Sequence, residues 1–562
     1  MSRQESTKLP VQRQVTEAIK TISTPRLDRA DIVIVGNGIA GLSAAVEVRR
    51  LAPDKRIVII TEQIHPTINT PALKQFAVGR LTREQLLAYP AGTERAERIH
   101  VVTARVEEIH ARSKYVSIKG GDNLLGFGYD SLLLATGSAP LGLRADLPGR
   151  DFDGVCTLHR LQDYLDLRRR LSEVSEAVVI GGGAHAIETV MGLLHWGITV
   201  HWLIRGEHFM HRILDRPASE MVLEHVRRAG CKVYTETEVV GVVGRVGAVA
   251  GVITNHQEMI PCQLVLTCTG TQPVTTLAEH SSVPLQHQRG ILVDDQLRTN
   301  VANIYAAGDV AALKNPQTGA YETRAQWYSA VSQGRKAAAA MTGHEELARQ
   351  PFGVQWHATH VGHLSMLTIG DPLCLKEKVT TLTDTSQGSY RRMAILDDRL
   401  IGYLSLGQTQ PDSMAMKRII DEGHPVRDII KPLLKGTFDA RSYLSQRHSR
   451  AAHGVLTSAK LPALSATRNP VSHVQLLPLT EPRISIHGTS QPATIEEDDE
   501  ISPFTGNLPS ISGKIVESTL APALPGERSP SGSLWAYAKA EKSGGSSRSL
   551  WSYGSEERSR DA

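Results

Sequence analysis

Two short glycine-rich segments are the residues of this sequence with the clearest chemical use. The first is Gly36-Asn37-Gly38-Ile39-Ala40-Gly41, and the second is Gly181-Gly182-Gly183-Ala184-His185-Ala186. Glycine permits a tight turn and leaves room for a ligand beside the backbone, while the first turn of a following helix points N–H groups at negative charge. Each segment therefore predicts a phosphate site, provided that a strand precedes it and a helix follows it.

The sequence around both segments meets this condition. Each segment has a short apolar strand before it, a helical run after it and then a second strand. The first set is Asp31 to Val35, Leu42 to Leu51 and Arg56 to Ile60, and the second set is Ala177 to Ile180, Ala186 to Trp196 and Thr199 to Ile204. Such strand–turn–helix units form dinucleotide-binding domains. Two of them predict a flavin, FAD, that stays bound and a nicotinamide nucleotide that visits.

The residue at the end of the second strand differs in charge between the two units. Glu62 follows the first glycine segment by about 20 residues, where a carboxylate can accept hydrogen bonds from both ribose hydroxyls. In the second unit Arg205 stands at this place instead of an acid. A guanidinium attracts a 2′-phosphate, so NADPH is favoured over NADH. The alternative is that Arg205 is merely solvated and the enzyme prefers NADH or neither nucleotide.

Two further motifs give the chain a family resemblance. Leu133 to Pro140 contains the sequence Ala-Thr-Gly, and Asn303 to Val310 contains Ala-Gly-Asp. With the two glycine segments, they follow the order and spacing found in flavoproteins with two dinucleotide-binding domains. The chain from about residue 30 to 445 resembles the FAD-dependent pyridine nucleotide-disulfide oxidoreductase family. It is most similar to members without a redox disulfide, such as rubredoxin and ferredoxin reductases and the flavin module of nitrite reductase.

The resemblance implies an α/β fold with two Rossmann-like domains, a small α/β C-terminal domain and a tail. The expected parts are an N-terminal extension (1–29), an FAD domain in two parts (30–150 and 276–345), an NAD(P)H domain (151–275), the C-terminal domain (346–445) and the tail (446–562). In the third domain, Ile395 to Tyr403 predicts a hairpin that turns at Asp397 and Asp398, and 412–434 predicts helices. The tail is rich in proline and serine, which predicts disorder.

The resemblance also implies which residues bind the cofactors. Asp309 is expected to hydrogen-bond the ribityl chain, and Trp327 is expected where a helix passes the flavin ring. The expected cofactor-binding residues are Gly36, Gly38, Ile39, Ala40, Gly41, Glu62, Val106, Ala135, Thr136, Gly137, Gly181, Gly183, Ala186, Arg205, Gly270, Gly308, Asp309 and Trp327. No metal site is predicted, because no carboxylate or cysteine completes the set His357, His360 and His363.

A lysine–glutamate pair near flavin N5 recurs in the family, and this chain has candidates for both members. Glu188 matches the glutamate at the end of the second glycine motif, and Lys74 is its expected partner. A positive charge beside N5 stabilises the anion that forms as hydride arrives, and the glutamate orients the lysine. The alternative is that Glu188 is an ordinary polar helix residue and Lys74 a solvated loop charge.

Cysteine placement narrows the expected chemistry. Disulfide reductases of the family carry a Cys-x-x-x-x-Cys pair after the second strand, and the matching segment here, Pro66 to Phe76, has no cysteine. None of the five cysteines forms a Cys-x-x-Cys pair, so neither a disulfide relay nor a structural zinc site is predicted. Electrons must then leave from the flavin itself. The expected acceptor is an iron–sulfur or rubredoxin-like protein, a quinone or O₂.

Composition excludes several other classes of protein. Of 562 residues, 41% are hydrophobic and 21% charged, and 62 basic against 58 acidic residues give a net charge of +4. This balance favours a globular protein and gives no reason to expect nucleic acid as a partner. The sequence has no apolar run long enough to span a membrane and no signal-like segment, which predicts a cytoplasmic protein. The oligomeric state stays open, with a homodimer as one possibility.

Two rival functions follow from the same residues. In the first, the chain is a non-catalytic regulator that binds FAD and NAD(P)H and acts through its tail, in which Trp535 with Tyr537 is echoed by Trp551 with Tyr553. In the second, it is an NADH oxidase that forms H₂O₂ or water.

Overall fold

The computed structural model describes residues 26–119, 124–282, 285–315, 319–386, 388–408 and 412–447. Residues 26–445 among them belong to one compact unit. The predicted tail, with its repeated tryptophan–tyrosine pairs, lies outside the described residues. No helix within the described ranges has the length and apolar run needed to cross a bilayer.

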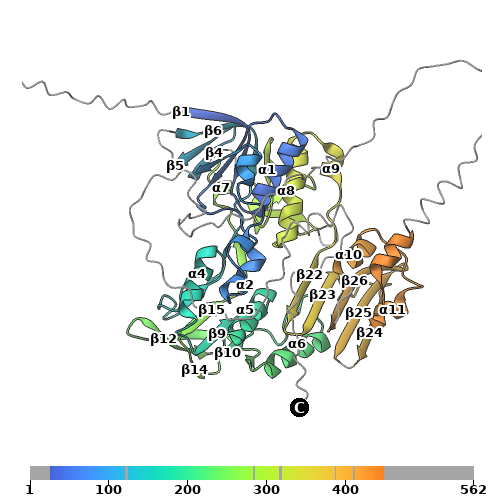
Figure 1. Ribbon diagram of the computed structural model, residues 1–562. Helices are drawn as coiled ribbons and strands as arrows, with labels where there is room; N and C mark the ends of the chain where they lie inside the picture. Colours follow the sequence, from blue (N-terminus) through green and yellow to red (C-terminus); the bar gives the residue numbers. More distant parts are fainter. Residues whose placement is uncertain are drawn as a thin grey trace, which may run out of the picture. The chain divides into compact units, whose positions relative to one another are not determined.

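The first glycine segment lies at the carboxyl ends of the strands of a seven-stranded sheet (Figure 1). The strand order is β3-β2-β1-β6-β5-β4, with β19 paired to β6. The strands are β1 (Arg26–Val35), β2 (Ile57–Thr61), β3 (Ile99–Thr103), β4 (Arg105–His110), β5 (Tyr115–Lys119), β6 (Leu124–Leu134) and β19 (Ile304–Ala306). The pairs among β1, β2, β3, β6 and β19 are parallel, and β2 is buried along its whole length. Burial on both faces explains why these strands are continuous apolar runs.

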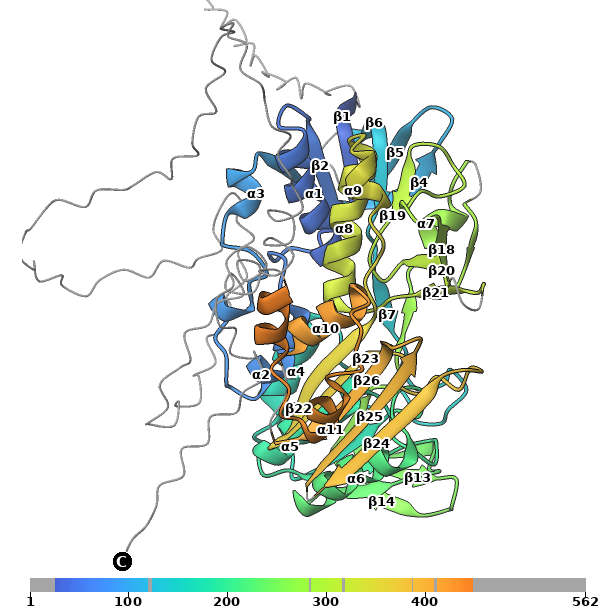
Figure 2. The ribbon, with the colours of Figure 1, turned by 90° about the vertical axis from the view of Figure 1, so that its right-hand side faces the viewer.

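Helices α1 (Ile39–Leu51) and α8 (Trp327–Met341) pack against each other beside this sheet, as both ribbon views show (Figures 1 and 2). Their backbones approach closely, because a Cβ on Gly334 would lie 2.3 Å from the carbonyl oxygen of Ala40. Alanines 337 to 340 of α8 are buried in the same cluster. The glycine in the middle of α8 therefore lets this helix approach the first glycine segment closely.

A second, fully parallel sheet carries the second glycine segment. Its order is β11-β10-β9-β15-β8. The strands are β8 (Val155–Thr157), β9 (Glu176–Ile180), β10 (Thr199–Leu203), β11 (Lys232–Tyr234) and β15 (Leu264–Thr267), and the associated helices are α4 (Leu161–Arg170), α5 (Ala184–His195) and α6 (Arg216–Arg228). A three-stranded antiparallel sheet follows α6 in the chain, made of β12 (Val239–Arg245), β13 (Ala248–Thr254) and β14 (Met259–Pro261).

Two segments of the chain connect the nucleotide units. They pair with each other as the short antiparallel strands β7 (Ser138–Pro140) and β16 (Thr271–Pro273). Shorter elements complete the first unit: η1 (Thr70–Ala72), α2 (Leu73–Ala77), η2 (Glu84–Leu86), α3 (Thr93–Ala96), α7 (Thr276–Glu279), β17 (His287–Gln288), β18 (Gly290–Val293), β20 (Ala311–Lys314) and β21 (Tyr321–Thr323). Helix α2 packs against α4 and α5 of the second unit.

The C-terminal part is an antiparallel sheet of order β22-β23-β26-β25-β24 with helices on one face. Its elements are β22 (Trp356–Val361), β23 (Leu364–Gly370), β24 (Thr380–Ser386), β25 (Ser389–Leu396), β26 (Arg399–Gly407), α10 (Ser413–Asp421) and α11 (Ile430–Lys435), and the preceding α9 (Glu345–Arg349) packs on α8 of the first unit. One face packs on α10 and α11. The other shares a hydrophobic cluster with the second nucleotide unit through residues such as Val361 and Met366.

The predicted fold class is confirmed, and the differences lie at element ends. Helix α1 begins at Ile39, inside the glycine segment, because its first turn is the turn that the glycines form. Strand β1 begins at Arg26, earlier than expected, since its first residues pair with the start of β6. The predicted hairpin of the third domain turns at Asp397 and Asp398, which both have positive φ.

One partly buried acid links the C-terminal sheet to the second nucleotide unit. Asp215 caps α6 by accepting a hydrogen bond from the Ala218 amide at 3.2 Å. Its Oδ2 also accepts from the hydroxyl of Tyr390 and from Arg392 Nη1, the latter at 3.1 Å. Since the side chains of Arg392 and Asp215 are only 15% and 18% exposed, this pair has lost most of its water. Removing one partner therefore leaves the other charge poorly compensated.

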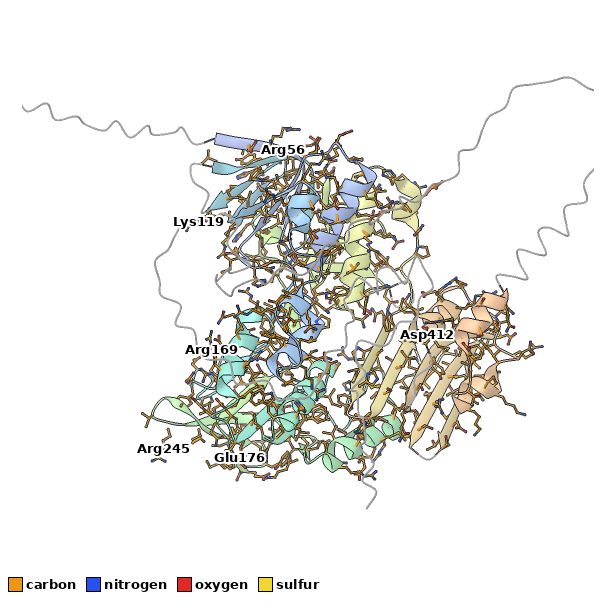
Figure 3. The ribbon with its side chains drawn as sticks, viewed as in Figure 1. Arg56, Lys119, Arg169, Glu176, Arg245 and Asp412 are labelled. Atoms are coloured by element: carbon orange, nitrogen blue, oxygen red, sulfur yellow. The ribbon has the colours of Figure 1, made fainter. Side chains whose placement is uncertain are left out.

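Asp215→Ala is expected to destabilise the protein by about 2 to 4 kcal/mol, the sum of a lost helix cap and an unpaired arginine. Asp412→Ala is the matched control, because Asp412, labelled in Figure 3, caps α10 and pairs with the half-exposed Arg441. The control should lose about 1 kcal/mol of unfolding free energy, the contribution of the helix cap alone. Chemical denaturation of both variants measures the difference, and equal losses would contradict a fastening role for Asp215.

Candidate functional site

The three glycines of the first segment serve different physical needs. Gly36 has φ +108°, and a Cβ there would lie 2.3 Å from the carbonyl oxygen of Ala135. A Cβ on Gly41 would lie 2.1 Å from the carbonyl oxygen of Gly36. Gly38, the N-cap of α1, has ordinary extended angles, and its Cβ would meet nothing within 4 Å. The fold itself requires Gly36 and Gly41, whereas Gly38 leaves open space at a helix N-terminus, as a bound phosphate needs.

The second segment repeats this arrangement. Gly181 has φ +136°, and its Cβ would lie 2.2 Å from the carbonyl oxygen of Cys268. Gly183, the N-cap of α5, again has open space where a Cβ would stand. Ala186 is fully buried at the position that matches Gly41. In both segments a glycine with open space beside it therefore stands at the N-terminus of a long helix, the arrangement that a phosphate needs.

Several predicted residues line the same edge of the first sheet. Glu62 follows β2 and is exposed, whereas Val106 on β4 and Ala135 after β6 are buried. Thr136 donates a hydrogen bond to the Val274 carbonyl at 2.8 Å, which ties the end of β6 to the second of the two connecting segments. Gly137 follows with φ +70°. The strand ends thus gather these residues around the first glycine segment, at the edge where parallel sheets bind ligands.

Gly308 and Asp309 lie at the end of β19 at this edge. Gly308 has φ +84°, and its amide donates to Gln333 Oε1 at 2.9 Å. Asp309 Oδ2 accepts a hydrogen bond from Ser138 at 2.8 Å, and burial raises the pKa of Asp309. Asp309 forms no ion pair with any described residue. Further hydroxyl donors, such as those of a ribityl chain, suit a carboxylate in this setting.

Trp327, the first residue of α8, has a buried indole Nε1 without a hydrogen-bond partner among the described residues. Leaving such a donor unpaired costs about 1 to 3 kcal/mol, so an acceptor atom of a ligand is expected there. With the open space at Gly38 and the buried carboxylate of Asp309, this donor makes the first unit fit FAD.

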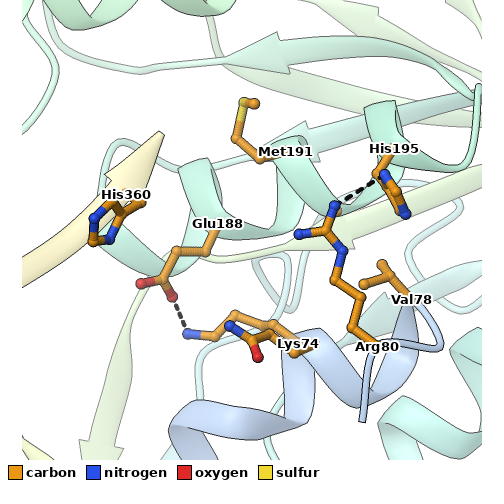
Figure 4. A pocket seen from close by; sticks show the side chains of 9 residues that line it. Lys74, Val78, Arg80, Glu188, Met191, His195 and His360 are labelled. Carbon is orange, nitrogen blue, oxygen red and sulfur yellow. Dashed lines mark hydrogen bonds and ion pairs between the residues drawn. The ribbon is translucent and has the colours of Figure 1, made fainter. Parts of the chain in front are cut away.

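Lys74 and Glu188 form an ion pair between α2 and α5 (Figure 4). Their side chains are 17% and 9% exposed, so neither is a solvated surface charge. The other oxygen of Glu188 accepts a hydrogen bond from Thr359 of β22 at 2.9 Å. Beside the pair is a small pocket lined by Lys74, Gln75, Val78, Arg80, Glu188, Met191, Gly192, His195 and His360. Three segments distant in sequence thus meet at Glu188.

The environment keeps Glu188 ionised. Burial opposes its ionisation, but the charge of Lys74 and the hydrogen bonds from Lys74 and Thr359 outweigh burial and hold the pKa of Glu188 below its ordinary value. Burial, reinforced by Lys74, lowers the pKa of His185 to about 3, so this imidazole is neutral. Its Nε2 lies 2.9 Å from the hydroxyl of Tyr164. A fixed positive charge on Lys74 can therefore face the space between the two nucleotide units.

The remaining predicted residues lie around the second unit. Arg205 follows β10, is exposed and has no ion-pair partner among the described residues, which leaves its guanidinium available to a ligand. Gly270 has φ +110° after β15, and its carbonyl accepts from the Leu141 amide at 2.9 Å. His357 and His360 lie on strand β22, and His363 follows it, so the three do not share a helical face.

Sequence reasoning missed three residues that act on this site. Thr359 belongs to a strand without any motif, and only the three-dimensional packing brings it to Glu188. His185, in the second glycine segment, and Tyr164 of α4 form a part-buried pair, and the histidine within that segment was the one available signal. These contacts depend on how the units pack, which local patterns do not encode.

The glycine geometry predicts opposite effects for two neighbouring substitutions. Gly36→Val forces a side chain onto the Ala135 carbonyl at a positive φ, which is expected to cost about 3 kcal/mol or more of stability. Gly38→Val enters open space, so the fold is retained while the FAD content of the purified protein falls at least about tenfold. Circular dichroism on heating and flavin absorbance per protein measure the two effects. A folded Gly38→Val variant that retains its flavin would contradict this assignment.

Comparison with known proteins identifies the family. The model of the family described as pyridine nucleotide-disulphide oxidoreductase matches residues 30–334. The rubredoxin-NAD(+) reductase of Pseudomonas putida is 28% identical over 322 residues, which cover 57% of this chain and 82% of that protein. The benzene 1,2-dioxygenase system ferredoxin–NAD(+) reductase subunit of Pseudomonas putida is 26% identical over 412 residues, covering 71% of this chain and 97% of that protein.

Solved structures agree on the fold. The covalent complex of putidaredoxin reductase with putidaredoxin matches with a TM-score of 0.64 and 23% identity, covering 73% of this chain and 99% of the matched chain. The predicted resemblance and the enzyme class are confirmed, together with the cofactor pair of FAD and a nicotinamide nucleotide. With more than half of its length matched by the family model, the chain belongs to the pyridine nucleotide-disulphide oxidoreductase family.

Proposed function

We propose that the protein transfers hydride from NADPH to FAD and passes the electrons to a small iron–sulfur or rubredoxin-like protein, without a redox disulfide. The observation that carries this proposal is the buried pair of Lys74 and Glu188, which lies where α2 of the first unit meets α5 of the second. Bound FAD would supply an acceptor for the hydride and a carrier that can release electrons singly.

The chain's own residues account for the polar part of this chemistry. Glu188 holds the ammonium group of Lys74 in one place, and Lys74 offers positive charge to the negative charge that develops during hydride arrival. Because α5 begins at the second glycine segment, the same helix that presents Glu188 also points its N-terminus at the nucleotide phosphates. One rigid helix thus orients both the hydride donor and the stabilising charge.

The cysteines support electron transfer directly from the flavin. All five are free, and Cys268 is the one whose electrostatic interactions reach Lys74 and Glu188. Burial raises the pKa of Cys268 to about 11 in spite of Lys74, so its thiol is protonated at neutral pH. A protonated, buried thiol is a poor nucleophile and a poor relay. The segment from Pro66 to Phe76, next to the pair, has no cysteine at all.

The choice of acceptor is supported by the relatives. Two of them are named as reductases of rubredoxin or of a ferredoxin, and one matched structure is a complex with putidaredoxin. A quinone or O₂ would equally accept electrons from an exposed flavin, so both belong in the test as competing acceptors. The regulatory alternative depends on the tail beyond residue 447, which lies outside the described residues.

Removal of the Lys74 charge tests the central step. Lys74→Met is expected to slow reduction of the bound flavin by NADPH about 10²- to 10³-fold, the usual cost of one lost charge-stabilising group. Anaerobic stopped-flow absorbance near about 450 nm measures it. In the wild type the acid limb of the rate profile should lie at lower pH than for an ordinary glutamate, because, in spite of burial, Lys74 and the hydrogen bonds hold the pKa of Glu188 below its ordinary value. An unchanged rate in Lys74→Met would remove the pair from the mechanism.

Arg205 tests the nucleotide preference. Arg205→Leu is expected to weaken NADPH binding about 10- to 100-fold and to leave NADH binding nearly unchanged, since only NADPH carries the 2′-phosphate. Arg212→Leu serves as a control for loss of a basic residue in the same segment. Titration of each variant with both nucleotides provides the comparison. Parallel weakening for NADPH and NADH would contradict a role for Arg205 in 2′-phosphate recognition.

A further inference from the structure

Thr359 lies on β22 in the C-terminal part of the chain, 171 residues after Glu188. It is fully buried, and its Oγ1 donates to Glu188 Oε1 at 2.9 Å. Lys74 occupies the other oxygen, Oε2. Glu188 thus divides its two carboxylate oxygens between the first unit and the C-terminal sheet. Figure 4 shows Glu188 extending from α5 toward Lys74, with β22 passing beside it.

Among the described residues, the titratable groups around Glu188 include no charged partner for its carboxylate other than Lys74. Its electrostatic neighbours are Lys74, His357, His185, Tyr164 and Cys268. Burial lowers the pKa of both histidines, which leaves them neutral at ordinary pH. Burial likewise raises the pKa of the tyrosine and of the cysteine, which keeps both protonated. Orientation of Glu188 therefore depends on Lys74 and on the Thr359 hydroxyl.

A second hydrogen bond has a definite geometric effect here. The terminal torsion of a glutamate is broad, so a carboxylate held at one oxygen can still turn about its last bond. When both oxygens are held from different directions, the plane of the carboxylate and the position of the lysine are fixed together. The Thr359 bond is also charge-assisted and lies in a dry setting, which makes it stronger than an exposed hydroxyl contact.

We propose that Thr359 is a positioning residue for hydride transfer: its hydrogen bond to Glu188 sets the place of the Lys74 ammonium beside the flavin. The proposal rests on the proposed function. It makes β22 part of the hydride-transfer site, so the C-terminal sheet contributes to the chemistry as well as to packing.

Three variants of the full-length, FAD-loaded protein test this role. Thr359→Val removes the hydroxyl at nearly constant volume, and Thr359→Ser keeps it. Thr368→Val is the matched control, because Thr368 is a buried threonine on β23, opposite His357 in register, with no contact to Glu188. Each variant is compared with the wild type by the anaerobic rate of flavin reduction with NADPH, the dissociation constant of NADPH, the midpoint potential of the bound flavin and the unfolding temperature.

Thr359→Val is expected to lower the reduction rate about tenfold, the effect of one lost hydrogen bond to a charged group. Its NADPH affinity should stay the same, and its midpoint potential should become more negative as the lysine moves away from the flavin. The lost bond also raises the pKa of Glu188, so the acid limb of the rate profile should move to higher pH. Thr359→Ser should recover rate and potential, and Thr368→Val should match the wild type.

Other outcomes overturn the proposal. Wild-type rate and potential in Thr359→Val would show that Lys74 holds its place without the threonine. Equal slowing in Thr359→Val and Thr368→Val, with equally lowered unfolding temperatures, would show a purely structural role. Failure of NADPH to reduce the flavin of the wild type would contradict the proposed function and this inference together. A reducible wild type with an unaffected Thr359→Val variant contradicts this inference alone.

Discussion

A carboxylate that is removed from water keeps its charge only where a cation and hydrogen-bond donors replace the solvent. In this chain the carboxylate is that of Glu188, whose side chain is 9% exposed. Lys74 supplies the cation and Thr359 supplies a hydrogen-bond donor. These three residues come from α2, α5 and β22. The full set of contacts forms only when all three elements are in contact, so the packing of the nucleotide units and of the C-terminal sheet determines how Glu188 is held.

The second constraint is steric and applies at both glycine segments. At Gly36 and at Gly181 the chain turns with a positive φ, close to the backbone of the next strand, and a side chain at either place would strike a carbonyl oxygen. These turns aim the N-termini of α1 and α5 at open space beside Gly38 and Gly183. The same local geometry therefore occurs twice, and the residues that follow the second strand of each unit, Glu62 and Arg205, differ in charge.

Much of this was predictable because the relevant signals are local. Strand, glycine turn and helix are adjacent in sequence, so the two nucleotide units could be predicted from short windows, whereas the exact ends of their strands could not. The pairing of Lys74 with Glu188 could be expected only from the family resemblance. The contacts of Thr359 with Glu188 and of Arg392 with Asp215 could not be predicted, because they depend on how an antiparallel sheet docks on another domain. Such docking follows from surface shape and leaves no periodic pattern in the sequence.

The central claim is that electrons pass from a nicotinamide nucleotide through the flavin without a disulfide, and a reductive titration tests it most directly. The FAD-loaded protein is titrated anaerobically with NADPH while its visible spectrum is recorded. The account predicts complete bleaching at about one NADPH per flavin, because the flavin alone stores the two electrons. Consumption of about two NADPH per flavin, with a long-wavelength band between thiolate and flavin, would reveal a redox disulfide and contradict the account.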